Sequence, residues 1–326
     1  MTNSPFALKA LHPACAMLIA CAAAGAAEYP AKSIRVIVPF PPDSGVDIVA
    51  RITVPALSAT LDKPLVIDNR AGADGVVGAH IAVKAVPDGY TLLMATGGIL
   101  CVLPLMQSNL PYVPARDFAS IAQLAATPNI LVTTVSLTAR SVKELIALAR
   151  EKPGAINYAS TGKGTGSHLA AELFRVQTGI TLVNVPYQGS AAALSDVIAG
   201  RVEIFFNNAL SALPDVRNGK LHALGVISPE RLSIAADIPT IAEAGVPAYA
   251  AETWYGLVAP TGTPRAIILR LNNALVRIFQ HPDIGARLAA DGARVTAGTP
   301  RQFADHLATE NTKWGTVLKA SALSVN

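Results

Sequence analysis

The sequence predicts a two-lobed α/β protein with a ligand cleft between two α/β domains. Short β-branched runs alternate with helical stretches from Tyr29 onwards, and after Arg265 the pattern is helical only. Two further runs, Ile130–Val132 and Trp254–Ala259, are placed to cross from one lobe to the other. The alternation indicates parallel sheets covered by helices on both faces. Two crossing strands make a hinge beside a cleft.

The elements follow in chain order, with Pro-Gly, Asn-Gly and Asp-Gly steps at 153, 218 and 88 marking helix ends and turns. In the first lobe we expect strands at 34–38, 65–67 and 91–95 and helices at 46–61 and 76–85. In the second lobe we expect a helix at 141–151, another beginning near Ser167, and strands at 129–134, 156–159, 182–185, 202–206 and 222–227.

Three closing helices, at about 265–279, 283–290 and 300–320, predict that the chain returns to brace the first domain. The expected division is therefore a leader at 1–27, a discontinuous domain 1 at 28–125 and 261–326, and domain 2 at 126–260.

The N-terminus has the pattern of a cleaved export signal. Lys9 precedes the apolar stretch Ala14–Ala24, and Ala24-Gly-Ala26 supplies small residues for cleavage. The stretch is too short to span a bilayer, so we expect export to a periplasm. Leu18-Ile-Ala-Cys21 also resembles a lipidation pattern, which would anchor the protein through Cys21. After ordinary cleavage only Cys101 remains, so no disulfide is expected and Cys101 is interpreted as a small core residue.

Composition excludes two classes of protein. Half of the residues are hydrophobic and 15% are charged, which excludes a disordered chain. The net charge is +4 and the pI is near 9, but Lys and Arg form no run and aromatic residues make up only 5%. No basic stripe or stacking platform is present, so nucleic acid is not an expected partner.

The most informative segment is the glycine-rich turn Ser160–His168. A β-type run enters a loop with glycines at 162, 164 and 166, and a helix follows. Glycines allow the backbone to approach a ligand, and the first N–H groups of a helix have no internal partner. This turn therefore predicts an anion site, in which the hydroxyls of Ser160, Thr161, Thr165 and Ser167 around the loop can donate to a carboxylate. The alternatives are that Ser167 only caps the helix and that His168 pairs with Glu172.

The first lobe offers two similar turns. In Phe40–Asp47, Ser44 or Asp43 is positioned to cap the helix that begins near Val46, and Asp47 lies in its first turn. For Asp47, simple stabilisation of the helix dipole is an equal alternative to ligand contact. The second turn is Thr96-Gly97-Gly98. Tyr187 and Asn207 follow strands of the second lobe at the edge where α/β sheets bind ligands, although such residues are structural as often as functional.

Other chemistries fit this turn less well. Gly162-Lys163-Gly164 lacks the following Ser or Thr and the spaced glycine of a P-loop. No G-x-S-x-G elbow supports a serine hydrolase, although a triad from distant positions stays open. A metal site lacks recognisable ligands.

Long ordered motifs carry a family resemblance. They cover essentially the whole chain after the leader and include Tyr29–Pro42, Asp68–Ala79, Pro87–Leu93, Ser160–His168, Val185–Tyr187, Pro239–Gly245 and Trp254–Pro260. The chain resembles the substrate-binding proteins of tripartite tricarboxylate transporters, also called Bordetella uptake gene (Bug) receptors.

The resemblance implies a type II periplasmic-binding-protein fold that closes on a small organic carboxylate and needs no cofactor. It also implies delivery to integral membrane subunits of the transporter, with no catalytic residue, and we expect a monomer. The ligand-binding residues implied are Phe40, Ser44, Gly45, Asp47, Thr96, Gly97, Ser160, Gly164, Thr165, Ser167, His168, Tyr187 and Asn207. The alternatives are an exported serine hydrolase and a ligand-sensing adaptor.

The chain departs from the family at three places. Pro41-Pro-Asp-Ser-Gly45 replaces the usual Pro-Ala-Gly-Gly, Gln188 stands where the family often has Lys, and Asn207 stands where it often has Asp. These changes lead to the hypothesis that the ligand has an uncharged or aromatic tail instead of a second carboxylate.

Overall fold

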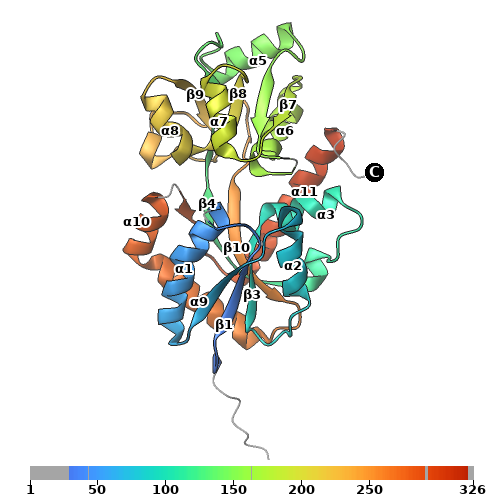
Figure 1. The fold of residues 1–326 in the computed structure, drawn as a ribbon, viewed down its shortest axis with the longest axis vertical. Coiled ribbons are helices and arrows are strands. Elements are labelled where there is room, and N and C mark those ends of the chain that lie inside the picture. The colour runs from blue at the N-terminus through green and yellow to red at the C-terminus, as the bar shows by residue number, and fades with distance from the viewer. Residues whose placement is uncertain (1–28, 43, 163, 291–292, 322–326) are drawn as a thin grey trace, which may run out of the picture.

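The computed structural model describes residues 29–42, 44–162, 164–290 and 293–321. The expected leader, its cleavage site, Cys21, Asp43 and Lys163 lie outside these residues. The described chain forms two α/β lobes stacked along the long axis of the molecule (Figure 1). No helix in the described part of the chain is long and apolar enough to cross a membrane.

The first lobe is built on a six-stranded sheet in the order β11-β4-β10-β3-β1-β2. Its strands are β1 (Ile34–Val38), β2 (Leu65–Asn69), β3 (Thr91–Thr96), β4 (Phe118–Thr127), β10 (Thr253–Pro260) and β11 (Arg294–Val295). Strands β1, β2 and β3 are parallel, whereas β10 is antiparallel to both β3 and β4.

The second lobe is built on a five-stranded sheet in the order β7-β6-β8-β5-β9. Its strands are β5 (Asn129–Thr134), β6 (Asn157–Ser160), β7 (Val183–Pro186), β8 (Ile204–Asn208) and β9 (Leu221–Val226). Strand β6 is parallel to β7 and β8, and β5 is antiparallel to β8 and β9. Both sheets are therefore mixed and not parallel throughout as expected. Strands β10 and β11 run against the other strands of the first sheet, and β5 runs against those of the second.

Helices cover both faces of each sheet, as predicted. Helices α1 (Gly45–Leu61), α9 (Arg265–Gln280) and α10 (Pro282–Ala290) share one core of the first lobe. The opposite face is covered by α2 (Val76–Val83), the π-helical turn η2 (Gly98–Val102) and α11 (Pro300–Ala320). In the second lobe, α7 (Ser190–Ile198) and α8 (Ala209–Arg217) pack on one face, and α5 (Val142–Glu151) and α6 (Gly166–Thr178) on the other. Short helical turns complete the chain: η1 (Ala73–Gly75), α3 (Leu103–Met106), α4 (Pro114–Asp117) and η3 (Ser233–Ala235).

The lobes are joined where β4 and β10 lie side by side in the centre of the molecule (Figure 1). The chain passes from the first sheet to the second between Thr127 and Asn129, next to the crossing expected near Ile130–Val132, and those three residues lie within β5. Strand β10 was expected to cross, and it pairs along its whole length with β4 in the first sheet. The residue ranges of the two domains stay a prediction, although this pairing places 253–260 with the first lobe's sheet.

The closing helix α11 has a strong local start signal. Thr299 and Gln302 form a capping box, in which Thr299 accepts from the Gln302 amide and the Gln302 side chain accepts from the Thr299 amide. The helix then runs from the first lobe towards the second and contacts α6 (Figure 1). The predicted return of the chain to the first domain is thus also a return to the cleft.

Candidate functional site

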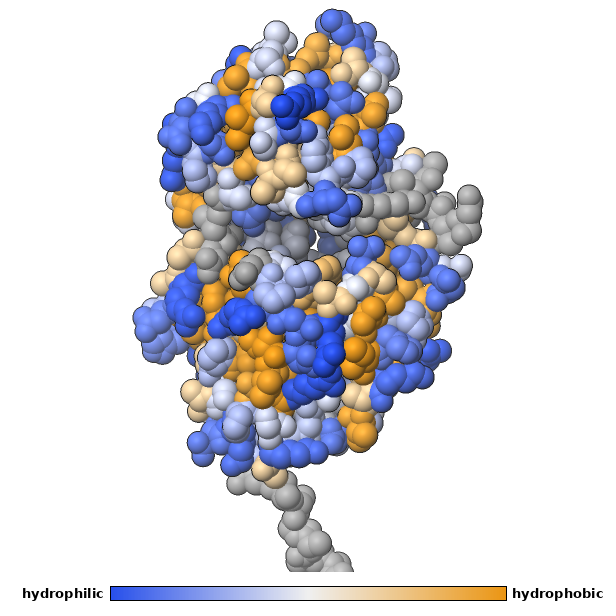
Figure 2. Space-filling model, viewed as in Figure 1, coloured by the Kyte–Doolittle hydropathy of each residue, from blue (hydrophilic) through white to orange (hydrophobic). Residues whose placement is uncertain are grey.

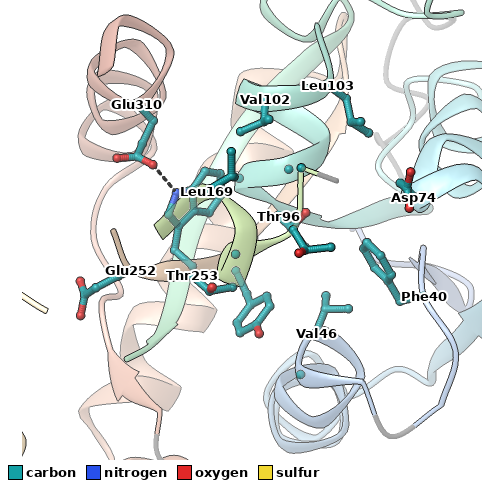
Figure 3. Close-up of a pocket in the computed structure, with 18 of the residues that line it drawn as sticks. Phe40, Val46, Asp74, Thr96, Val102, Leu103, Leu169, Glu252, Thr253 and Glu310 are labelled. Carbon is teal, nitrogen blue, oxygen red and sulfur yellow. Dashed lines mark hydrogen bonds between the residues drawn. The ribbon is translucent and has the colours of Figure 1, made fainter. Parts of the chain in front are cut away.

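A cavity of about 230 Å³ lies between the lobes, where the molecular surface is hollowed (Figure 2, Figure 3). Its walls come from the turns before α1 and α6, the segment from Thr96 to Leu103, strand β10 and helix α11. The lining residues are Phe40, Ser44, Gly45, Val46, Asp74, Thr96, Gly97, Gly98, Val102, Leu103, Gly164, Thr165, Gly166, Leu169, Glu252, Thr253, Trp254, Tyr255, Glu310 and Trp314.

The first lobe presents the N-terminus of α1 to this cavity. The first bond of the helix runs from the amide of Ile48 to the carbonyl of Ser44 at 2.9 Å, so the amides of Gly45 and Val46 have no acceptor within the helix. Ser44 is the N-cap residue, but its hydroxyl donates to the carbonyl of Pro41 at 2.7 Å and makes no side-chain cap. Ser44, one of the two expected capping residues, therefore does not cap the helix through its side chain, because its hydroxyl closes the turn before the helix. The other candidate, Asp43, lies outside the described residues.

The second lobe presents the N-terminus of α6 to the same cavity. The helix begins at Gly166, one residue before the predicted start, and Thr165 is its N-cap. The amide of Leu169 donates to the carbonyl of Thr165 at 2.9 Å, which leaves the amides of Gly166 and Ser167 without an acceptor in the helix. The Thr165 hydroxyl donates to the carbonyl of Gly162 at 2.7 Å, so this end has no side-chain cap either.

Side chains hold the glycine-rich turn in shape. Ser167 Oγ accepts from the amide of Thr161 at 3.0 Å, and His168 Nδ1 accepts from the amide of Gly164 at 3.2 Å. Ser167 is therefore not the N-cap, although it does stabilise the turn. These bonds fix the loop before any ligand arrives.

Two glycines allow the helix ends to reach the cavity wall. A Cβ atom on Gly45 would lie 2.3 Å from the Tyr255 hydroxyl oxygen, and one on Gly166 would lie 2.4 Å from Thr253 Oγ1. Tyr255 and Thr253 both belong to β10. The two helix ends therefore approach positions two residues apart on β10.

The electrostatics of the cavity favour an anion near the helix ends. Each helix N-terminus carries a partial positive charge, and two of them from different lobes face one space. Among the described residues, the charged side chains that line the cavity are all acidic: Asp74, Glu252 and Glu310. An anion at this position would be held by backbone amides and not by a cationic side chain of the described chain.

Seven of the thirteen predicted site residues line the cavity, namely Phe40, Ser44, Gly45, Thr96, Gly97, Gly164 and Thr165. Thr96 Oγ1 accepts from the amide of Ile99 at 3.3 Å, which fixes the turn that follows β3. The structure thus brings three turns, distant in sequence, to one place.

The other six predicted residues lie behind the lining that the structure describes. Asp47 is fully buried and accepts from Asn69 at 2.8 Å and from Arg51 at 2.6 Å, which matches its role as a helix-stabilising residue. Ser167 and His168 support the loop from behind. Ser160 is fully buried, and its hydroxyl has no hydrogen-bond partner within the described chain.

Tyr187 and Asn207 bond within the second lobe. The Tyr187 hydroxyl donates to Asp196 at 2.9 Å. Burial is the main cause of the raised pKa of Tyr187, and the bond to the Asp196 carboxylate adds to it. The Asn207 amide donates to Ser211 Oγ at 2.9 Å. Glu172, the suggested partner of His168, accepts from the Tyr158 hydroxyl at 2.8 Å and from Arg175 at 2.6 Å.

Sequence reasoning missed one wall of the cavity. Glu310 Oε2 accepts from the indole N–H of Trp254 at 3.2 Å and from that of Trp314 at 2.9 Å, and Glu310 also pairs with Lys313. Trp254 and Tyr255 are recognisable from their motif, but nothing local in α11 marks Glu310 or Trp314 as site residues. Only the return of α11 to the cleft places them there.

The described residues hold neither a cluster of metal ligands nor an accessible thiol. No group of three or more His, Cys, Asp or Glu in these residues could hold a metal ion. Cys101 is fully buried, and burial raises the pKa of its thiol to about 12, which confirms its interpretation as a core residue.

Comparison with known proteins assigns the family. The sequence profile of the tripartite tricarboxylate transporter family receptor (TctC) matches residues 49–323. The chain belongs to this family. It is therefore a substrate-binding receptor, and the TctC receptors are periplasmic solute-binding proteins.

Individual TctC-like proteins agree in sequence and in fold. BugT of Bordetella pertussis is 35% identical over 292 residues, which cover 89% of this chain and 90% of BugT. The structure of Rpa4515 of R. palustris with adipate is 33% identical with a TM-score of 0.81, and the match covers 92% of this chain and 100% of that one. MatC (Rpa3494) from Rhodopseudomonas palustris with bound malate is 30% identical with a TM-score of 0.76, covering 89% and 100%.

Proposed function

We propose that this TctC receptor captures a small organic carboxylate by closure of its two lobes. The observation that carries the proposal is the pair of uncapped helix N-termini, α1 and α6, which face one cavity from different lobes. An anion that contacts both ends stabilises only the arrangement in which the lobes are closed, which is the differential affinity that closure requires. The adipate and malate in the two solved relatives support a carboxylate as the anion.

In this proposal the protein is exported to the periplasm, where it binds its ligand and closes. The closed receptor then delivers the ligand to membrane subunits of a tripartite tricarboxylate-type transporter. The family assignment supports this partner. The receptor acts as a monomer and performs no chemistry on the ligand. Ser167 and His168 are engaged by loop amides, which gives them a structural role in place of a hydrolytic one.

The proposal is tested by measuring binding, closure and ligand fate together. A panel of mono- and dicarboxylates is screened by thermal shift and titration calorimetry, with the matching alcohols or amides as uncharged controls. At a hundredfold excess over Kd, a ligand raises the free energy of unfolding by about 2.7 kcal/mol. We expect such a ligand to lower the radius of gyration in small-angle scattering and to be recovered unchanged by mass spectrometry. Stabilisation by the uncharged controls alone, or consumption of the carboxylate, would contradict the proposal.

A further inference from the structure

Apolar side chains form much of the cavity lining, both beside the helix ends and across from them. Val102, Leu103 and Leu169 lie across the cavity from Val46 (Figure 3). The rings of Trp254 and Trp314 complete this wall, and both indole N–H groups donate to Glu310. With their donors already satisfied, the indoles offer a ligand only apolar ring surface.

The three acidic residues of the lining differ in whether a basic side chain pairs with them. Glu310 is balanced by Lys313 and the two indoles, and Glu252 pairs with Arg294 through a 3.0 Å bond. Asp74 differs from both. It is exposed, lies in the left-handed region with a φ of 55°, and forms no hydrogen bond or ion pair with the described residues. Of the three acidic residues in the lining, Asp74 is therefore the one without a charged partner among the described residues.

Figure 3 places Asp74 and Glu310 on opposite sides of the cavity. A ligand whose first carboxylate lies at the helix ends would bring a second carboxylate towards an apolar wall or towards Asp74. Burial of an unpaired charge against apolar surface is costly, and a like charge adds repulsion. A methyl or ring end would instead gain from the removal of apolar surface from water.

We propose that the ligand of this receptor is a monocarboxylate with an apolar body, and that Asp74 is a specificity-determining residue that disfavours dicarboxylates. This inference rests on the proposed function, since it takes the helix ends as the carboxylate site. It distinguishes the chain from Rpa4515 and MatC, whose structures hold adipate and malate.

Titration calorimetry with matched ligand pairs tests the inference. Hexanoate and adipate have the same chain length and differ by one carboxylate, and benzoate and terephthalate form a rigid pair. We expect the monocarboxylate of each pair to bind at least tenfold more tightly, which corresponds to about 1.4 kcal/mol. Equal or tighter binding of adipate and terephthalate would overturn the inference while leaving the proposed function intact. Failure of all four to bind, together with every other carboxylate, would instead overturn the proposed function.

The role of Asp74 is tested by Asp74→Asn, which keeps the side-chain shape and tolerates the left-handed backbone. The matched control is Asp62→Asn, because Asp62 is also exposed and left-handed, with a φ of 51°, but lies at the far end of α1. We expect Asp74→Asn to narrow the preference for hexanoate over adipate by about threefold or more, through tighter adipate binding. Asp62→Asn should leave the preference unchanged. An unchanged preference in Asp74→Asn, or an equal change in both variants, would remove Asp74 from the inference.

Discussion

The turns before α1 and α6 present the same chemical group to the cavity but are built in different ways. Before α6, the loop is held by side-chain bonds from Ser167 and His168 to loop amides. Before α1, the turn contains two prolines, and side chains donate to its carbonyls: Ser44 to that of Pro41 and Asn69 to that of Phe40. Its glycine packs against Tyr255. Both turns present free helix amides although different side chains hold them. An anion site made of backbone amides therefore requires a particular path of the chain and tolerates different side chains along it.

The comparison is tested most strongly by adding a methyl group at each helix start. In Gly45→Ala the new Cβ meets Tyr255, whose ring is held in the core, and in Gly166→Ala it meets the Thr253 hydroxyl, which can rotate. We expect carboxylate affinity to fall about a hundredfold in Gly45→Ala and about tenfold in Gly166→Ala, or about 2.7 and 1.4 kcal/mol. Titration calorimetry measures both values.

The control for these variants is Gly315→Ala, because a Cβ there meets nothing within 4 Å and the residue lies inside α11. We expect unchanged affinity and a gain of up to about 1 kcal/mol in the free energy of unfolding. If Gly45→Ala and Gly166→Ala bind ligand as well as this control, the helix ends do not form the site.

A second test separates the two turns by their dependence on hydroxyl groups. Ser167→Ala removes the acceptor of the Thr161 amide, so we expect a loss of about 1–2 kcal/mol in the free energy of unfolding. Ser44→Ala removes only a bond to the Pro41 carbonyl at a solvent-accessible turn, and we expect a loss below about 0.5 kcal/mol. Urea unfolding with unchanged m-values measures both. Equal losses would show that the α1 turn also depends on its side chain.

The smallest expected effect is on the pH dependence of stability, for which each lobe offers one histidine. Burial lowers the pKa of His306 in α11 below 6.5, and burial with nearby Arg140 lowers that of His222 in β9. Each ring therefore binds a proton more weakly in the folded than in the unfolded chain, so stability is full above pH 6.5 and falls as the pH drops below it.

His306 is the more enclosed ring, since it contacts Trp254 with ring centroids 5.3 Å apart and its buried Nε2 has no partner in the described chain. Below pH 6.5 the free energy of unfolding falls with pH, and we expect His306→Gln to reduce this slope more than His222→Gln does. Each substitution should change the slope by less than about 1.4 kcal/mol per pH unit. Urea unfolding between pH 5 and 8 measures the slopes. A larger change in His222→Gln would contradict the assignment to α11.

The element pattern could be predicted because most strands and helices here carry local signals. Ile34–Val38 and Asn129–Thr134 are β-branched runs that form β1 and β5 within the predicted bounds. Strand β4 was not predicted. Its sequence, Phe118–Thr127, is rich in alanine, which has low strand propensity, and β4 is held in place by pairing with β10 on one side and β11 on the other. Such a strand is defined by its neighbours and not by its own residues.

Strand direction could not be predicted for a similar reason. The local patterns of β5 and β10 are those of buried strands, and nothing in them indicates that each runs antiparallel to its neighbours. Direction depends on the route that the chain takes between the lobes.

The sequence by itself determined the two-lobed α/β fold, the family, and the glycine turns at the starts of α1 and α6, because glycine spacing and apolar periodicity act over a few residues. The tertiary structure decided which side chains line the cavity. It turned Asp47, Ser167 and His168 into supports, and it brought Trp314 and Glu310 from the end of the chain into the wall of the cavity. The physical reason is that a backbone amide site is fixed by local conformation, whereas the surface that selects the rest of the ligand is assembled from segments up to about 270 residues apart, Phe40 and Glu310 among them.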